Sequence, residues 1–255
     1  MRFLLRCKPN TKKPPTGKKV AIIGAGPAGL GAAGVLLCNG HEVDVYDALP
    51  EPGGLLIIGI PAFRVPKEGV REGVKELAEA GARFFTSTFV YCGEKPHEHE
   101  ALLFVKEFVN LEDIIKKYDA VVITTGTWRS RSLEIPGEDL PGVYKALDYL
   151  ARIYANQLGY LPKEKVYPTG RKVLVVGAGL TAVDAARTRP TGKSKIYPNA
   201  PRPARQVRKA KAGTCARQRV RGGVRHSPHR GWGDPNTAWQ VCRHRVQPRR
   251  HHKGR

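Results

Sequence analysis

The sequence predicts an α/β fold of the Rossmann type, in which parallel strands are buried between helices. Two observations support this prediction. An apolar run leads into a glycine turn at Gly24 and again at Gly177, and an alternating strand after the first turn ends at Asp47. A third observation limits the fold, because regular apolar periodicity is lost soon after Arg187.

The first turn follows residues 20–23, a continuous apolar run as a strand buried on both faces requires. Gly24, Gly26 and Gly29 then form the pattern G-x-G-x-x-G. Gly24 permits the tight turn, Gly26 lets the backbone approach a pyrophosphate, and Gly29 lets the next helix pack closely on the strand. This spacing predicts a dinucleotide site.

The helix after this turn is expected over residues 27–38, with Pro27 in its first turn and Asn39-Gly40 as its stop. Its N-terminal N–H groups and dipole would face the phosphates. The strand "EVDVY" ends at Asp47, where a carboxylate can accept hydrogen bonds from an adenosine ribose.

The intervening segments alternate in the same way. Val70, Val74 and Leu77 have helical spacing, and Gly81 ends that helix. Residues 114–115 belong to a short helix before a buried strand, "AVVITT". A turn-rich connection, "PGEDLPG", leads to a further helix over residues 143–154. Each segment is consistent with an α/β domain.

A second strand and turn begin at residues 173–176. Gly177, Gly179 and Ala182 give G-x-G-x-x-A after this apolar run. By itself this motif is weak, but together with the first unit it indicates a second nucleotide-binding domain.

These motifs resemble the glutamate synthase small (beta) subunit family of NAD(P)H-dependent flavoproteins. The resemblance rests on "GAGPAGL", on "PEPGGLLIIGIPAFRVPKEGVREGVKEL", on residues 118–150 and on "GRKVLVVGAGLTAVDAAR". It covers residues 17–187 and implies a three-layer FAD/NAD(P)-binding domain in which electrons pass from nicotinamide to flavin directly.

The resemblance also implies roles for individual residues. For FAD, these are the pyrophosphate turn, the ribose acid, the residues along the cofactor, a positive charge near the phosphates, the adenine strand and a second flavin turn: Gly24, Gly26, Pro27, Ala28, Gly29, Asp47, Gly54, Leu55, Arg64, Val90, Thr125 and Gly126. For NAD(P)H, they are Gly177, Gly179, Leu180, Thr181 and Ala182. Leu180 departs from the asparagine that the family pattern has there. Surface, capping or core roles remain alternatives for Arg64, Asp47 and Val90.

Cysteine usage excludes two kinds of redox centre. The five cysteines show no C-x-x-C, which argues against a redox-active disulfide of the thioredoxin-reductase type, and we expect scattered reduced thiols. Only Cys7 precedes the first turn, so the iron–sulfur ligands of the wider family have no counterpart. No metal site is predicted.

The last quarter of the chain has a different composition. Residues 188–255 contain 19 Lys and Arg and one acid, Asp234, whereas residues 1–187 contain 25 Lys and Arg and 21 acids. The tail has no Leu, Phe or Met, and its Ile and Val number six. Such a segment cannot bury enough apolar surface to offset the entropy of ordering, and we expect it to be disordered.

We interpret residues after about 187 as translation in the wrong frame, which leaves the domain incomplete. Two alternatives stay open. A selected basic tail would bind nucleic acid through its charge, with Tyr197, Trp232 and Trp239 as stacking surfaces. A short nucleotide-binding protein with an unrelated extension is the other.

The expected organisation has four parts: a polar leader (1–17), the N-terminal half of an FAD-binding domain (18–169), the start of an NAD(P)H-binding domain (170–187) and the basic tail (188–255). The expected function is an NAD(P)H-dependent FAD oxidoreductase that passes electrons to a glutamate synthase large subunit or a ferredoxin-like acceptor. Because the flavin-covering half is missing, we expect this chain to bind FAD weakly or not at all. We expect a cytoplasmic protein without membrane spans, and only non-specific binding of nucleic acid by the tail.

Overall fold

The computed structural model describes Phe3, Cys7, residues 13–95, 103–170 and 172–188, and the backbone of residues 193–197. All of these belong to one compact unit, Met1–Pro201. The predicted disorder of the remaining tail lies outside the described residues. None of the helices in this described part is both long and apolar enough to cross a membrane.

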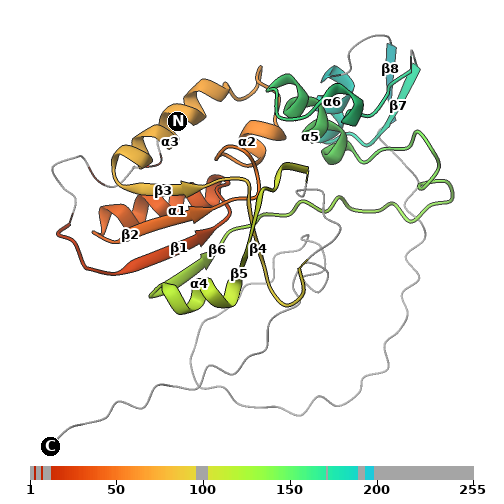
Figure 1. The fold of residues 1–255 in the computed structure, drawn as a ribbon. Helices are drawn as coiled ribbons and strands as arrows, with labels where there is room; N and C mark the ends of the chain where they lie inside the picture. Colours follow the sequence, from red (N-terminus) through yellow and green to blue (C-terminus); the bar gives the residue numbers. More distant parts are fainter. Residues whose placement is uncertain are drawn as a thin grey trace, which may run out of the picture. The chain divides into compact units, whose positions relative to one another are not determined.

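A four-stranded parallel sheet forms the centre of the first domain (Figure 1). Its order is β3-β2-β1-β6, and its strands are β1 (Lys19–Ile23), β2 (Glu42–Tyr46), β3 (Ala82–Phe85) and β6 (Ala120–Ile123). In register, Ile23 pairs with Tyr46 on one side and with Ile123 on the other. The ends of β1, β2 and β6 therefore meet at one edge, where the glycine turn begins.

Helices α1 (Pro27–Cys38) and α3 (Lys67–Glu79) cover one face of this sheet (Figure 1). The expected helix over 27–38 is confirmed at both ends. The core on this face joins Ile22, Val43 and Val45 of the strands to Leu30 of α1 and Leu77 of α3. Alternation along β1 and β2 sends these side chains to the helices.

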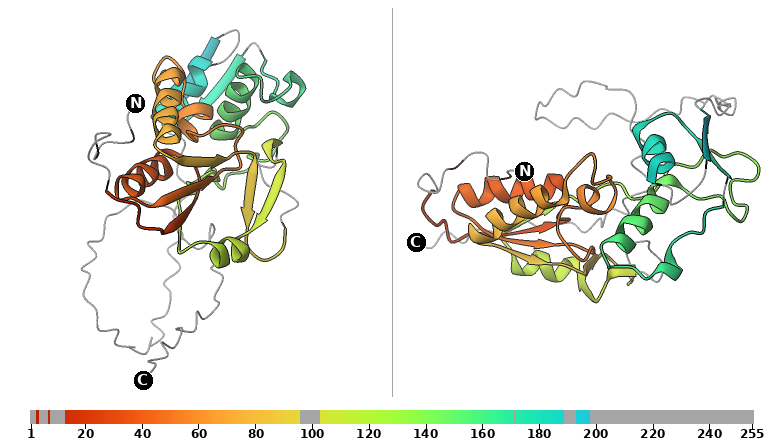
Figure 2. Two further views of the ribbon diagram at one scale, coloured as in Figure 1. Left: turned by 60° about the vertical axis from the view of Figure 1, so that its left-hand side comes forward. Right: turned by 90° about the horizontal axis from the view of Figure 1, so that it is seen from above.

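The opposite face is covered by a third layer, made by α4 (Leu111–Lys117) and a two-stranded parallel sheet, β4 (Thr88–Tyr91) and β5 (Glu107–Asn110) (Figure 2). The core on this face contains Ala21, Tyr46, Ile114 and Tyr118, with Val90 packed against it. The expected three-layer α/β architecture is confirmed.

A turn at residues 86–87 separates β3 from β4. Ser87 has a positive φ of 53°, and its N–H donates to the Leu49 carbonyl at 2.8 Å. The chain therefore turns between β3 and β4, and β4 leaves the central sheet. The change of direction depends on the Leu49 loop, which local sequence does not reveal.

The N-terminal leader is attached to the domain. Phe3 is buried in the same core cluster as Leu30 of α1 and Leu77 of α3, and the Lys13 N–H donates to the Cys38 carbonyl at 3.0 Å. Gly40 lies so close to the leader that a Cβ there would come within 2.1 Å of the Pro14 carbonyl oxygen. The leader thus packs along the C-terminal end of α1.

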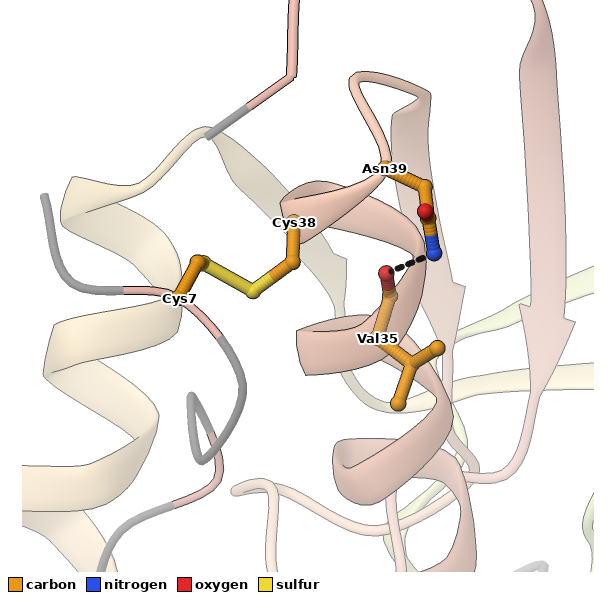
Figure 3. The surroundings of a disulfide bond; sticks show 4 residues. All are labelled: Cys7, Val35, Cys38 and Asn39. Carbon is orange, nitrogen blue, oxygen red and sulfur yellow. Dashed lines mark hydrogen bonds between the residues drawn. A yellow bond between two sulfur atoms is a disulfide. The ribbon is translucent and has the colours of Figure 1, made fainter. Parts of the chain in front are cut away.

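The expectation of reduced thiols is wrong for this leader. Cys7 forms a disulfide with Cys38, the last residue of α1 (Figure 3). Cys92 is disulfide-bonded as well. The physical reason is the docking of the leader, which brings Cys7 beside a helix end 31 residues away in sequence. Spacing alone could not have revealed this pair, because the sequence contains no C-x-x-C.

Two further helices lie beside α3. The short α2 (Leu55–Ile58) and α5 (Ala146–Gln157) pack together with α3, and the cluster between them includes Ile57, Ile58, Val70 and Ala155. A 3-10 helix of one turn, η3 (Lys163–Lys165), precedes the strand that leads into the second glycine turn. The helix expected over 143–154 is thus present but begins three residues later, at Ala146.

The second glycine turn lies in a β-α-β element: β7 (Lys172–Val176), α6 (Leu180–Thr188) and β8 (Lys193–Tyr197). Strand β8 pairs with β7 in parallel, with Val176 opposite Tyr197. Regular structure therefore extends past residue 187, where we expected it to end. Parallel pairing is made by backbone groups, which do not require the apolar side chains that the tail lacks.

Candidate functional site

The first glycine turn is closely packed on its inner side. Gly24 has φ +104°, and a Cβ there would lie 2.4 Å from the Thr124 carbonyl oxygen. A Cβ on Gly29 would lie 1.9 Å from the Gly24 carbonyl oxygen. The Thr124 hydroxyl donates to this same oxygen at 2.8 Å. Only glycine lets α1 approach the strand this closely.

The outer side of the same turn is open. A Cβ on Gly26 would meet no heavy atom within 4 Å, and Gly26 has φ −70°, which any residue can adopt. Gly26 is the N-cap of α1 and makes no side-chain cap, and Pro27 and Ala28 are exposed. The first N–H groups of a helix lack intrahelical partners and favour an anion. This space therefore suits a phosphate.

A second glycine pair forms a wall of the open space. The Gly53 N–H donates to the Ala25 carbonyl at 2.8 Å. Gly54 has φ +57°, and a Cβ there would lie 2.9 Å from the Gly26 Cα. The predicted Gly54 is thus placed directly against the predicted Gly26. Leu55 follows as the first residue of α2 and is half-buried.

Asp47 lies at the end of β2, beside the turn. Its carboxylate accepts the Ala25 N–H at 2.5 Å and the Leu49 N–H at 2.8 Å. Burial raises the pKa of Asp47 to about 6, against the lowering effect of these two N–H groups. Each carboxylate oxygen keeps a further lone pair, which a ribose hydroxyl could use.

The other predicted FAD residues lie around this edge. Val90 is in β4, whose first residue, Thr88, donates its N–H to the Asp47 carbonyl at 2.8 Å. Thr125 and Gly126 follow β6 and are exposed, and Gly126 has φ +72°. They come directly after Thr124, which packs against Gly24. The fold thus brings Thr125 and Gly126 to the carboxyl edge of the sheet, whereas Val90 packs against the core on the face that β4 covers.

Arg64 forms an ion pair that the sequence did not predict. Its Nη1 lies 2.5 Å from the Asp184 Oδ2, and the Asp184 side chain is 7% exposed. The loop that follows α2 is thereby joined to α6. A role of Arg64 toward the cofactor phosphates stays a prediction.

The second glycine turn repeats the first in simpler form. Gly177 has φ +127°, and a Cβ there would lie 3.6 Å from the Cβ of Ala182, which is buried. A Cβ on Gly179 would meet nothing within 4 Å, and Leu180 and Thr181 are exposed. Glycine at 177 is therefore favoured by its positive φ and not by lack of space, and the turn is open at the start of α6, where a second nucleotide would approach.

Two residues near the first site were missed by the sequence analysis. Thr124 packs against Gly24 and Gly29 of the turn. The sequence signal for it was its position directly before Thr125, which was predicted to lie along the flavin. The Lys67 ammonium donates to the carbonyls of Leu56, at 2.6 Å, and Ile60, and so satisfies the C-terminal end of α2. Burial lowers the pKa of Lys67 to about 8. No local pattern distinguishes it from a surface lysine.

The model of the family described as pyridine nucleotide-disulphide oxidoreductase matches residues 18–225. The chain belongs to this family. Within it, the glutamate synthase [NADPH] small chain of Halomonas elongata is 41% identical over 175 residues, which are 68% of this chain and 34% of that protein. The small chain of Escherichia coli is 39% identical over 176 residues, 68% of this chain and 34% of that protein.

These relatives confirm the predicted resemblance to glutamate synthase small chains. Among solved structures, Mycobacterium tuberculosis FprA in complex with NADPH is similar with a TM-score of 0.52 and 30% identity, over 69% of this chain and 36% of that one. The chain spans about a third of the length of the small chains that it matches. Both glycine turns lie within the residues that match the family model, 18–225.

Proposed function

We propose that the chain forms part of an NAD(P)H-dependent FAD oxidoreductase of the glutamate synthase small-chain type. One observation supports this most directly: the open space at Gly26, bounded by the N-terminus of α1 and the Gly53–Gly54 turn, with Asp47 beside it. A helix N-terminus receives the pyrophosphate, and the acid at the end of the second strand receives the ribose.

The residues present fit the adenosine half of FAD. Gly26 and Ala28 would hold the pyrophosphate with backbone N–H groups, Asp47 the ribose, and Val90 the adenine. Leu55, Thr125 and Gly126 would lie along the rest of the cofactor. FAD, when bound, supplies the hydride acceptor and the electron donor of the reaction. The chain's own contribution is to bind and orient it.

NAD(P)H would bind at the second turn. Gly179 is open where a pyrophosphate would approach, and α6 begins at Leu180 with its free N–H groups. Thr181 and Ala182 complete the turn. No catalytic acid or base is proposed, since the cofactors carry the chemistry.

The electron acceptor belongs to the proposal as well. The relatives include glutamate synthase small chains and the NADPH-Fe(3+) oxidoreductase subunit beta of Geobacter sulfurreducens, which is 33% identical. These names describe chains or subunits of larger assemblies, and a partner protein is therefore the proposed electron acceptor. A glutamate synthase large subunit is the first candidate and a ferredoxin-like carrier the second, and the cytoplasm is the proposed location.

The test is nucleotide binding by the full chain. ADP, which carries the adenosine and pyrophosphate of FAD, is titrated calorimetrically into the wild type, Gly26→Val and the matched control Gly31→Val. Both glycines are open to a Cβ, but Gly31 lies within α1 rather than at its N-cap. We expect Gly26→Val to weaken ADP binding at least tenfold, about 1.4 kcal/mol, and Gly31→Val to change it little.

Two results would contradict the proposal. One is a wild-type chain that does not bind ADP at millimolar concentration, and the other is an equal loss in both variants. FAD is titrated in parallel, and we expect it to bind only as tightly as ADP, because the segment over its flavin ring is not among the residues that resemble the family.

A further inference from the structure

Ala185 of α6 packs in a buried cluster with side chains of α5, and three further side-chain contacts join α6 to the first domain. Arg64 pairs with Asp184, as described. The Arg187 guanidinium lies over the Phe63 ring, 4.4 Å from its centroid. At the end of the helix, the Tyr154 and Thr188 hydroxyls are 2.7 Å apart.

The ion pair is the contact whose loss would leave a buried charge without its partner. Asp184 is a buried acid, whereas the Arg64 side chain is 33% exposed. A buried carboxylate left without a partner is strongly unfavourable, so Asp184 draws α6 toward Arg64. By contrast, an arginine over an exposed aromatic ring and a pair of hydroxyls bind weakly.

The pair lies at a cavity of about 250 Å³. The cavity is lined by Leu55 of the first site, by Thr181 of the second turn, and by Arg64 and Asp184 between them. The ion pair therefore sits where the two candidate nucleotide sites approach each other.

We infer that Arg64 and Asp184 are positioning residues, which fix the second glycine turn in its orientation toward the first. The inference rests on the proposed function for its purpose, because two cofactors that exchange a hydride must be held in a defined geometry. Arg64 acts through Asp184 and α6. Asp184 lies two residues after Ala182, so a tilt of α6 moves the turn directly.

Amide hydrogen exchange of the full chain tests this without any ligand. Arg64→Met leaves Asp184 buried and unpaired, and we expect the amides of residues 177–188 to exchange about tenfold faster while those of β1 and α1 are unchanged. The matched control is Arg71→Met, which breaks the Arg71–Glu51 pair, made of two hydrogen bonds of 2.9 Å, within the first domain. It should leave residues 177–188 as they are.

A double-mutant cycle completes the test. Asp184→Asn removes the buried charge, so adding it to Arg64→Met should recover part of the protection of α6. A merely structural role predicts instead that Arg64→Met accelerates exchange throughout the domain. That outcome, or equal effects of Arg64→Met and Arg71→Met on α6, would overturn the inference.

ADP binding separates this inference from the proposed function. Asp184→Asn should leave the part of the ADP binding that Gly26→Val removes within about twofold of the wild type, since the Gly26 turn is built by β1, α1 and the Gly53–Gly54 turn. If ADP fails to bind any variant while exchange follows the expected pattern, the proposed function fails and the positioning role of Arg64 and Asp184 stands. If ADP binds and exchange does not follow the pattern, only the positioning role fails.

Discussion

The Asp47 carboxylate lies 2.5 Å from the backbone nitrogen of Ala25, the residue between Gly24 and Gly26. This hydrogen bond joins the end of β2 to the glycine turn 22 residues earlier. It holds together the two parts of the site that would receive the pyrophosphate and the ribose. Its strength depends on the protonation of Asp47, because a carboxylate accepts more strongly when ionised.

Asp47→Asn should change how stability depends on pH. Since burial raises the pKa of Asp47 from 3.8 to about 6, the native state binds a proton more tightly than the unfolded state. The corresponding stability is present below about pH 4 and is lost as the pH rises to about 6, by roughly 3 kcal/mol at most. Urea unfolding at pH 4, 5, 6 and 7 should show this fall in the wild type and a flatter curve in the variant. Equal slopes would contradict it.

Gly29→Ala should destabilise the chain by about 1–3 kcal/mol or more, because its Cβ would be forced against the Gly24 carbonyl, which is backbone and cannot rotate away. Gly31→Ala is the control. Its Cβ enters open space, and alanine favours the helix by up to about 1 kcal/mol. Denaturant midpoints measure both. A Gly29→Ala variant as stable as Gly31→Ala would show that the turn can relax.

Lys67→Met should destabilise the chain by about 1–3 kcal/mol, because the carbonyls of Leu56 and Ile60 would lose their donor. Lys75→Met, an exposed lysine of the same helix paired with Glu79, should have an effect near zero. The lowered pKa of Lys67, about 8, predicts in addition that stability rises with pH between about 8 and 10.5. This rise should be absent in Lys67→Met.

Cys7→Ser should remove the covalent tie between the leader and α1. Because the cysteines are 31 positions apart in the sequence, the loop-closure model predicts a loss of about 3–4 kcal/mol under non-reducing conditions. The disulfide itself is checked by mass spectrometry of a non-reduced digest, in which the peptides of Cys7 and Cys38 should run as one species. In the presence of a reductant, wild type and Cys7→Ser should have the same stability.

Deleting residues 198–255 should remove a weak, salt-dependent and sequence-indifferent affinity for nucleic acid, because these residues carry most of the net charge of +22. Fluorescence anisotropy with two unrelated DNA duplexes at several salt concentrations measures this. Strong binding to one duplex at physiological salt would indicate a selected tail. Resequencing the gene near the codon for Arg187 would decide the reading-frame interpretation independently.

The sequence by itself determined the local elements of this protein. The run before Gly24, the spacing of the glycines and the Asn39-Gly40 stop placed α1 at residues 27–38, and alternation placed Asp47 at the end of β2. These features depend on neighbours in the chain: backbone sterics at glycine, helix-end signals and the two-residue period of a strand. They also sufficed to identify the family.

Tertiary structure decided the contacts between distant segments. The pairing of Arg64 with Asp184, the burial of Lys67 beneath α2, the Cys7–Cys38 bond and the pairing of β8 with β7 join residues whose distance depends on the path of the intervening chain. A charged side chain or a thiol reads the same in sequence whether it is solvated or buried. Only packing fixes its partner, because the free energy of a buried charge or a backbone donor depends on the groups that surround it.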